Sequence, residues 1–169
     1  MTDSFTAFLG DRHIATGDRE AVMRHILADH AGDEGAIRVH DDSSGKVVDL
    51  DYHDLASTEA TVPRGRGRPS LGVTAREVTL LPRHWDWLTT QRGGASATLR
   101  RLIDAARAEP RTLRQRQDAA YAFMAASCGD RTGYEEALRA LYRGEDAEFA
   151  AHIADWPEDV RAYIARLLG

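Results

Sequence analysis

Residues 76–88 read REVTLLPRHWDWL and define how the centre of this chain folds. Arg76–Leu81 contains valine and threonine and is bounded by proline, which is typical of a short strand. Pro82 suits the first turn of a helix, because its missing N–H has no partner there. Gly93-Gly94 should end that helix, and Ser96 can cap a second helix that carries an apolar stripe of leucine, isoleucine and alanine. The pattern predicts a strand followed by two helices.

An arginine arm, PRGRGRP over residues 63–69, lies directly before this segment. Arginine supplies charge and a planar donor fork for phosphates and for the acceptor edges of A·T-rich minor grooves. Glycine removes the side-chain bulk that would keep a backbone out of a narrow groove. The core Arg66-Gly67-Arg68-Pro69 resembles an AT-hook, the minor-groove arm of many chromatin and nucleoid proteins. The alternative is an ordinary linker rich in glycine, arginine and proline.

Positive charge is concentrated in the middle of an otherwise acidic protein. The chain of 169 residues has a formal net charge of −5. Residues 1–62 carry a net charge of −8, residues 63–110 carry nine arginines and a net charge of +5, and residues 111–169 carry −2. This distribution is expected of a protein that contacts nucleic acid through its central residues, while its acidic outer parts repel polyanions.

Composition excludes several protein classes. A hydrophobic fraction of 43% and a charged fraction of 29% are those of a soluble globular protein. No stretch approaches the ~20 apolar residues that span a bilayer, and Met1-Thr2-Asp3-Ser4 lacks the basic and apolar regions of a secretion signal. The single cysteine, Cys128, excludes an internal disulfide and should be a buried, inert thiol. We expect a cytoplasmic protein, associated with the nucleoid and without a membrane partner.

The two outer parts differ in their expected structure. The first contains two hairpins, with turns at Gly10-Asp11 and Ser43-Ser44-Gly45, and a helix capped by Asp18. The last part is helical, with cap signals at Thr112 and Thr132. The predicted fold class is α+β, divided into an acidic α+β lobe (1–62), the arm (63–73), the strand-helix-helix segment (74–109) and a helical lobe (110–169).

The central segment resembles the ribbon-helix-helix fold of bacterial repressors in its helix lengths, its Leu81-Pro82 junction and its Gly94-Ala95-Ser96 helix start. In that family two chains pair their strands into a ribbon that enters the major groove, and helix N-termini hold phosphates. The resemblance implies a homodimer. Side chains alternate between the two faces of a strand, so Arg76, Val78 and Leu80 share one face, and only arginine among them can form bidentate hydrogen bonds to a base. If the opposite face meets the DNA instead, it presents Glu77, which repels phosphate. Base-specific reading is therefore not expected, and a strand with two helices inside an ordinary domain remains the alternative.

At the level of the whole chain, the sequence resembles a bacterial family known only as a domain of unknown function (DUF2239-like). The resemblance rests on Gly67–Gly72, on Arg76–Leu88, on the Gly93–Ser96 turn and on Gly133-Tyr134-Glu135-Glu136-Ala137. It covers most of the chain and implies no activity.

An enzyme is the less favoured reading. Histidines and carboxylates gather on or near the second predicted hairpin, and such groups can hold a divalent cation. More often they form the solvated face of a half-buried hairpin. These residues are His40, Asp41, Asp42, Asp49, Asp51, His53 and Asp54. Because no nucleotide-binding loop, nucleophile elbow or zinc-protease helix is present, we expect neither an enzyme nor a cofactor or metal site.

The sequence therefore predicts a protein that binds double-stranded DNA, as a transcriptional regulator or a nucleoid-associated factor. The acidic lobe should keep non-specific binding weak. The alternative is a protein-interaction module that binds an acidic partner. The predicted DNA contacts are Arg64, Arg66, Gly67, Arg68, Arg76, Arg83, Ser96, Arg100 and Arg101.

Overall fold

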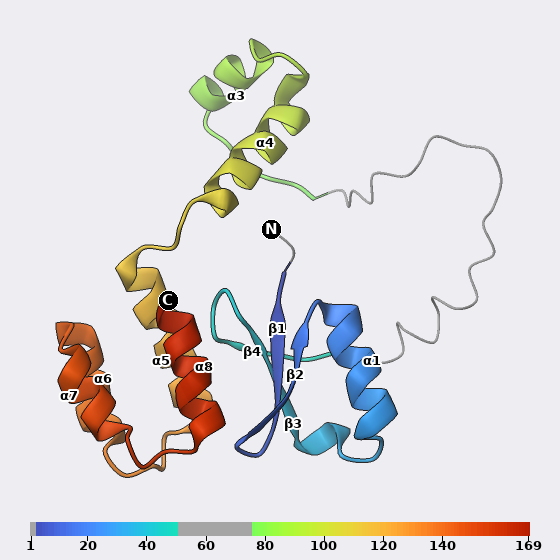
Figure 1. The fold of residues 1–169 in the computed structure, drawn as a ribbon. Coiled ribbons are helices and arrows are strands. Elements are labelled where there is room, and N and C mark those ends of the chain that lie inside the picture. Colours follow the sequence, from blue (N-terminus) through green and yellow to red (C-terminus); the bar gives the residue numbers. More distant parts are fainter. Residues whose placement is uncertain (1–2, 51–75) are drawn as a thin grey trace. The chain divides into compact units, whose positions relative to one another are not determined.

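A computed structural model of the chain describes residues 3–50 and 76–169, which fall into two compact units (Figure 1). The main unit joins residues 3–50 to residues 111–169, and the central unit comprises residues 76–110. The fold class is α+β, as predicted. The acidic lobe and the helical lobe, expected as separate parts, are joined in one unit. The arm lies outside the described residues, and with it the predicted contacts Arg64, Arg66, Gly67 and Arg68.

The main unit begins with a four-stranded antiparallel sheet of order β2-β1-β3-β4. Both predicted hairpins are present. The turn between β1 and β2 places Gly10 at φ 59°, a conformation that glycine adopts without steric cost. The strands are β1 (Phe5–Leu9), β2 (Arg12–Gly17), β3 (Ile37–Asp41) and β4 (Val47–Val48).

One face of this sheet packs against α1 (Arg19–Asp29). Asp18 caps the helix as predicted, because its Oδ1 accepts a hydrogen bond from the Ala21 N–H at 2.8 Å. A 3-10 turn (Glu34–Ala36) then leads into β3. The small core between helix and sheet contains Phe5, Ala7, Val22, Met23, Ile26, Val39 and Leu50.

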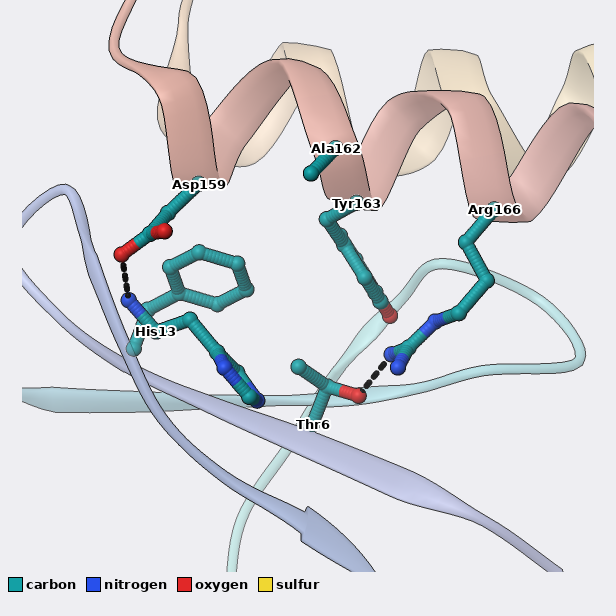
Figure 2. Close-up of a pocket in the computed structure, with 7 residues that line it drawn as sticks. Thr6, His13, Asp159, Ala162, Tyr163 and Arg166 are labelled. Carbon is teal, nitrogen blue, oxygen red and sulfur yellow. Dashed lines mark hydrogen bonds between the residues drawn. The ribbon is translucent and has the colours of Figure 1, made fainter.

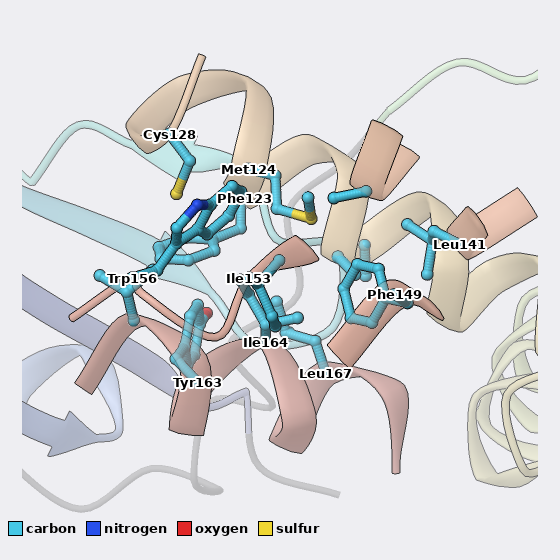
Figure 3. Packing of buried hydrophobic residues seen from close by; sticks show 14 of the residues in the cluster. Phe123, Met124, Cys128, Leu141, Phe149, Ile153, Trp156, Tyr163, Ile164 and Leu167 are labelled. Carbon is cyan, nitrogen blue, oxygen red and sulfur yellow. The ribbon is translucent and has the colours of Figure 1, made fainter. Parts of the chain in front are cut away.

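The opposite face of the sheet packs against the C-terminal helices. Successive strand residues point to opposite faces, so Phe8 of β1 leaves the first core and joins Phe123 and Tyr163 in the second. Figure 3 shows these helices closing over a core of aromatic and aliphatic side chains. The helices are α5 (Leu113–Ser127), α6 (Tyr134–Arg143), α7 (Asp146–His152) and α8 (Glu158–Leu168).

The helix starts confirm one predicted cap and correct another. Thr112 forms the predicted cap of α5: its Oγ1 accepts from the Gln115 N–H, and the Gln115 side chain accepts from the Thr112 N–H at 2.8 Å. The box predicted at Thr132 is wrong, because α6 starts from Gly133 without a side-chain cap. Gly133 has φ 79°, and a Cβ there would lie 2.8 Å from the His152 carbonyl oxygen, so close packing against α7 sets this helix start.

Cys128 is buried at the end of α5 and is a free thiol. The predicted burial is confirmed, and it raises the pKa of the thiol to about 11, which disfavours the reactive thiolate at neutral pH.

The central unit contains α3 (Pro82–Thr89) and α4 (Gly94–Ala108). The strand predicted over residues 76–81 is not formed in this single chain. A strand needs a partner for its backbone groups, and the described sheet includes no partner for this segment. Throughout the described residues, no helix is both long enough and apolar enough to cross a membrane.

Candidate nucleic-acid interface

The start of α3 places two of the predicted arginines at the surface. Leu81 has extended backbone angles, Pro82 occupies the first helical position, and the Leu81 carbonyl accepts from the His84 N–H at 2.8 Å. Proline therefore begins this helix as predicted. Arg83 in its first turn and Arg76 in the preceding extended segment are both exposed.

The turn between α3 and α4 corrects the expected role of Ser96. Gly93 and Gly94 have φ values of 92° and 77°, and this left-handed turn starts α4 at Gly94. Ser96 therefore lies within the first turn and does not cap the helix. That first turn has neither a side-chain cap nor an acidic residue. Its backbone N–H groups and the helix dipole favour an anion such as a phosphate.

Arg100 and Arg101 are exposed on α4. Because successive residues turn by 100° around a helix, neither arginine shares the face of Leu99, Leu102 and Ile103. Among the described residues, no acidic side chain forms an ion pair with Arg76, Arg83, Arg100 or Arg101. These guanidinium groups can therefore offer all of their donors to an external anion.

The apolar side of the central unit is largely uncovered. Leu88 and Thr98 are the only buried residues among residues 76–110, and the buried Thr98 Oγ1 has no hydrogen-bond partner within the described chain. Trp87 is 50% exposed and Ile103 is 56% exposed. A protein surface rarely leaves this many large apolar side chains in water without a partner. The exposed set is Val78, Leu81, Trp85, Trp87, Leu102 and Ile103.

The predicted Asp/His hairpin does not form a metal site in the described part of the chain. No group of three or more histidine, cysteine or acidic residues there has the geometry to hold a metal ion; Asp51, His53 and Asp54 lie outside it. The prediction that these residues form a solvated face is wrong for His40. Its side chain is fully buried against the rings of Phe8, Phe123 and Tyr163. Burial lowers the pKa of His40.

Sequence reasoning missed a pocket in the main unit, between α8 and the sheet (Figure 2). Its charged lining residues, Asp159 and Arg166, come from one face of α8, and Asp42 in the turn after β3 forms an ion pair with Arg166. A spacing of three or four residues places side chains on one face of a helix, and the sequence shows this spacing at Asp159, Ala162, Tyr163 and Arg166. Their partners on the strands are more than a hundred residues away in sequence, so spacing alone could not reveal the pocket.

Comparison with known proteins assigns the chain to a family without adding an activity. The family model described as an uncharacterized protein conserved in bacteria (DUF2239) matches residues 4–168. No curated protein matches the chain, and no solved structure does.

Proposed function

This chain belongs to the DUF2239 family, uncharacterized and conserved in bacteria, and we propose that it binds DNA, as a transcriptional regulator or a nucleoid-associated factor. The observation that carries the proposal is the set of exposed arginines on the central unit that have no acidic partner in the described chain: Arg76, Arg83, Arg100 and Arg101. In the acidic main unit, by contrast, several arginines are engaged, as Arg24 is with Glu20 and Arg166 with Asp42.

The electrostatic balance supports a localised contact. Residues 76–110 contain six arginines and four acidic residues, whereas the whole chain has a net charge of −5. Attraction to phosphates would therefore act on the central unit, and the acidic main unit would repel the duplex. The uncapped start of α4 adds backbone donors for a phosphate, and Ser96 in that turn adds a hydroxyl.

The arm supplies the contact to A·T-rich minor grooves in this proposal. Arg64, Arg66 and Arg68 alternate with glycine, so the backbone can approach the groove while the guanidinium groups reach its acceptor edges. Arg76 and Arg83 would contact the adjacent major groove or its phosphates. A protein bound in this way belongs at the nucleoid.

The binding form in this proposal is a homodimer. Ordering one residue costs about 1–2 kcal/mol of backbone entropy, and a unit of residues 76–110 with only Leu88 and Thr98 buried has little core to offset that cost. Antiparallel pairing of residues 76–81 from two copies would satisfy their backbone groups and cover Val78 and its neighbours.

Fluorescence anisotropy with a labelled A·T-rich duplex tests the DNA proposal. We expect saturable binding at 50 mM salt that weakens steeply at 200 mM. Arg100→Ala with Arg101→Ala should weaken binding to all sequences, since these residues would contact phosphates. The matched control, Arg24→Ala with Arg139→Ala, removes the same charge from the main unit and should change affinity much less.

The exposed tryptophans favour one second candidate, a protein-interaction module for an acidic partner. Trp85 and Trp87 are 41% and 50% exposed, and tryptophan and arginine are enriched at the centres of protein interfaces. Absence of any anisotropy change at 50 mM salt would end the DNA proposal and leave this candidate.

A further inference from the structure

A cavity of about 180 Å³ lies in the main unit, and all of the residues that line it belong to that unit. Figure 2 shows α8 along one side of it and the β1-β2 hairpin along the other. Nothing in the DNA proposal uses this cavity. It is lined by Thr6, Phe8, His13, Asp159, Ala162, Tyr163 and Arg166.

One end of the cavity is a guanidinium group that is firmly positioned and still accessible. Arg166 Nη2 donates to Asp42 Oδ1 at 3.2 Å and to Thr6 Oγ1, and its Cζ lies 4.8 Å from the centre of the Tyr163 ring. The Arg166 side chain nevertheless remains 45% exposed. A guanidinium has five donors in a planar fork, so this group can hold Asp42 and also bind a carboxylate from solution.

The other end is a carboxylate. Asp159 Oδ2 accepts from the His13 backbone N–H at 2.9 Å, which fixes the side chain at the start of the β2 strand. No described residue donates to its second oxygen. A rise of 1.5 Å per residue separates the Cα atoms of Asp159 and Arg166 by about 10 Å along α8.

Between the two charged ends the lining is mostly apolar. Phe8 and Tyr163 are buried and present ring surface, and Ala162 adds a methyl group from the same face of α8. His13 adds an imidazole ring, whose Nε2 lies 2.8 Å from Thr16 Oγ1. The cavity therefore has opposite charges at its two ends and mainly apolar side chains between them.

The balance of charge selects among ligand classes. Asp42 and Asp159 carry two negative charges near the cavity, and Arg166 carries one positive charge. A phosphate or another polyanion would meet a net negative site. A ligand with one charge of each sign, held apart by a short apolar chain, would complement both ends.

We propose that this cavity binds a small ω-amino carboxylate, with the ligand carboxylate on Arg166, the ammonium group on Asp159 and the methylene chain over Phe8 and Ala162. An α-amino acid fits less well, because its two charges share one carbon atom and cannot reach both ends. The proposal concerns the main unit only, so it stands whether or not the central unit binds DNA.

Isothermal titration calorimetry of the full chain tests the proposal, with 6-aminohexanoate as the probe. We expect saturable binding of 6-aminohexanoate and at least about tenfold weaker binding of hexanoate, hexan-1-amine and glycine, each of which loses one charged contact or the correct spacing. Hexanoate or glycine binding as tightly as 6-aminohexanoate would overturn the assignment to a ligand with separated charges. Absence of saturable 6-aminohexanoate binding would overturn the site itself.

Two variants with matched controls locate the binding. Asp159→Asn keeps an acceptor for the His13 N–H but removes the charge, and it should weaken 6-aminohexanoate binding about tenfold. Glu158→Gln removes the neighbouring exposed charge and should leave binding unchanged. Ala162→Leu should fill the cavity and abolish binding, whereas Ala165→Leu on the exposed side of α8 should leave binding unchanged. If Asp159→Asn and Ala162→Leu bind as the unaltered chain does, the ligand lies elsewhere and the proposal is wrong.

Discussion

The phenol of Tyr163 donates a hydrogen bond of 2.9 Å to Oδ1 of Asp42, which joins the last helix to the turn after β3. Asp42 also accepts from Ser4 Oγ at 2.6 Å and from Thr6 Oγ1 at 2.7 Å, so one carboxylate ties together both ends of the chain. Burial and the nearby carboxylate raise the pKa of Tyr163, which keeps the phenol protonated as a donor. This contact is one physical reason why the first and last parts of the chain form one unit.

Tyr163→Phe should lower the free energy of unfolding by about 2 kcal/mol, because it removes a buried hydrogen bond to a charged acceptor. Tyr142→Phe is the control. Its phenol donates to Asp118 at 3.2 Å on an exposed surface, so its loss should cost less than about 0.5 kcal/mol. Urea unfolding followed by circular dichroism measures both values, and equal losses would contradict the structural role of the Tyr163–Asp42 contact.

Buried His40 should make the protein less stable in acid. Its Nδ1–H donates to the Gly45 carbonyl at 3.0 Å, and burial lowers its pKa below the ordinary 6.5. The unfolded chain therefore binds this proton more readily than the folded chain does, so the His40 contribution is intact above pH 6.5 and is lost as the pH falls from there toward the folded-state pKa.

Urea midpoints at pH 7.5 and pH 5.0 check this direction. His40→Gln should reduce the difference between the two midpoints, whereas the control His84→Gln, at an exposed position, should leave it unchanged. An unaltered difference in His40→Gln would show that other groups carry the pH dependence.

Gly45 should tolerate no side chain. A Cβ at this position would lie 1.9 Å from the Ala119 carbonyl oxygen of α5, and φ is +68°. Gly45→Ala should therefore cost more than about 4 kcal/mol, through steric overlap in addition to backbone strain. Gly144→Ala separates the two effects, because Gly144 has φ +73° and no atom near the added Cβ. It should cost about 1–2 kcal/mol by thermal unfolding, and a similar cost at both sites would show that the turn does not pack tightly on α5.

In the proposed homodimer, the uncovered apolar face of α4 should form part of the contact, together with the paired residues 76–81. Leu102→Glu with Ile103→Glu places two charges on that face and should shift the protein from dimer to monomer, as measured by sedimentation velocity. Leu113→Glu, which changes an exposed apolar residue of the main unit, should leave the dimer intact. A monomer for the unaltered chain at micromolar concentration would contradict dimerisation.

Local signals in the sequence predicted the elements well. Gly10-Asp11, Asp18 and Thr112 mark a turn and two helix starts that the structure contains. These signals act within a few residues, so a single sequence reveals them.

Long-range packing could not be predicted in the same way. The burial of His40 depends on Phe123 and Tyr163, which are far away in the sequence, and a solvated hairpin was expected instead. Ser96 was predicted to cap α4, but it lies inside the helix, because the two glycines with left-handed backbone angles, Gly93 and Gly94, start the helix earlier. The pocket residues Thr6 and Arg166 meet only after the sheet has packed against α8.

The salt dependence of binding to an A·T-rich duplex tests the proposed DNA contact most directly. The logarithm of the binding constant should fall linearly with the logarithm of salt concentration, and replacing Arg64, Arg66 and Arg68 by alanine should reduce that slope by roughly 2–3 and remove the preference for A·T-rich over G·C-rich duplex. An unchanged slope in the triple variant, or no binding by the unaltered chain at 50 mM salt, would contradict the account.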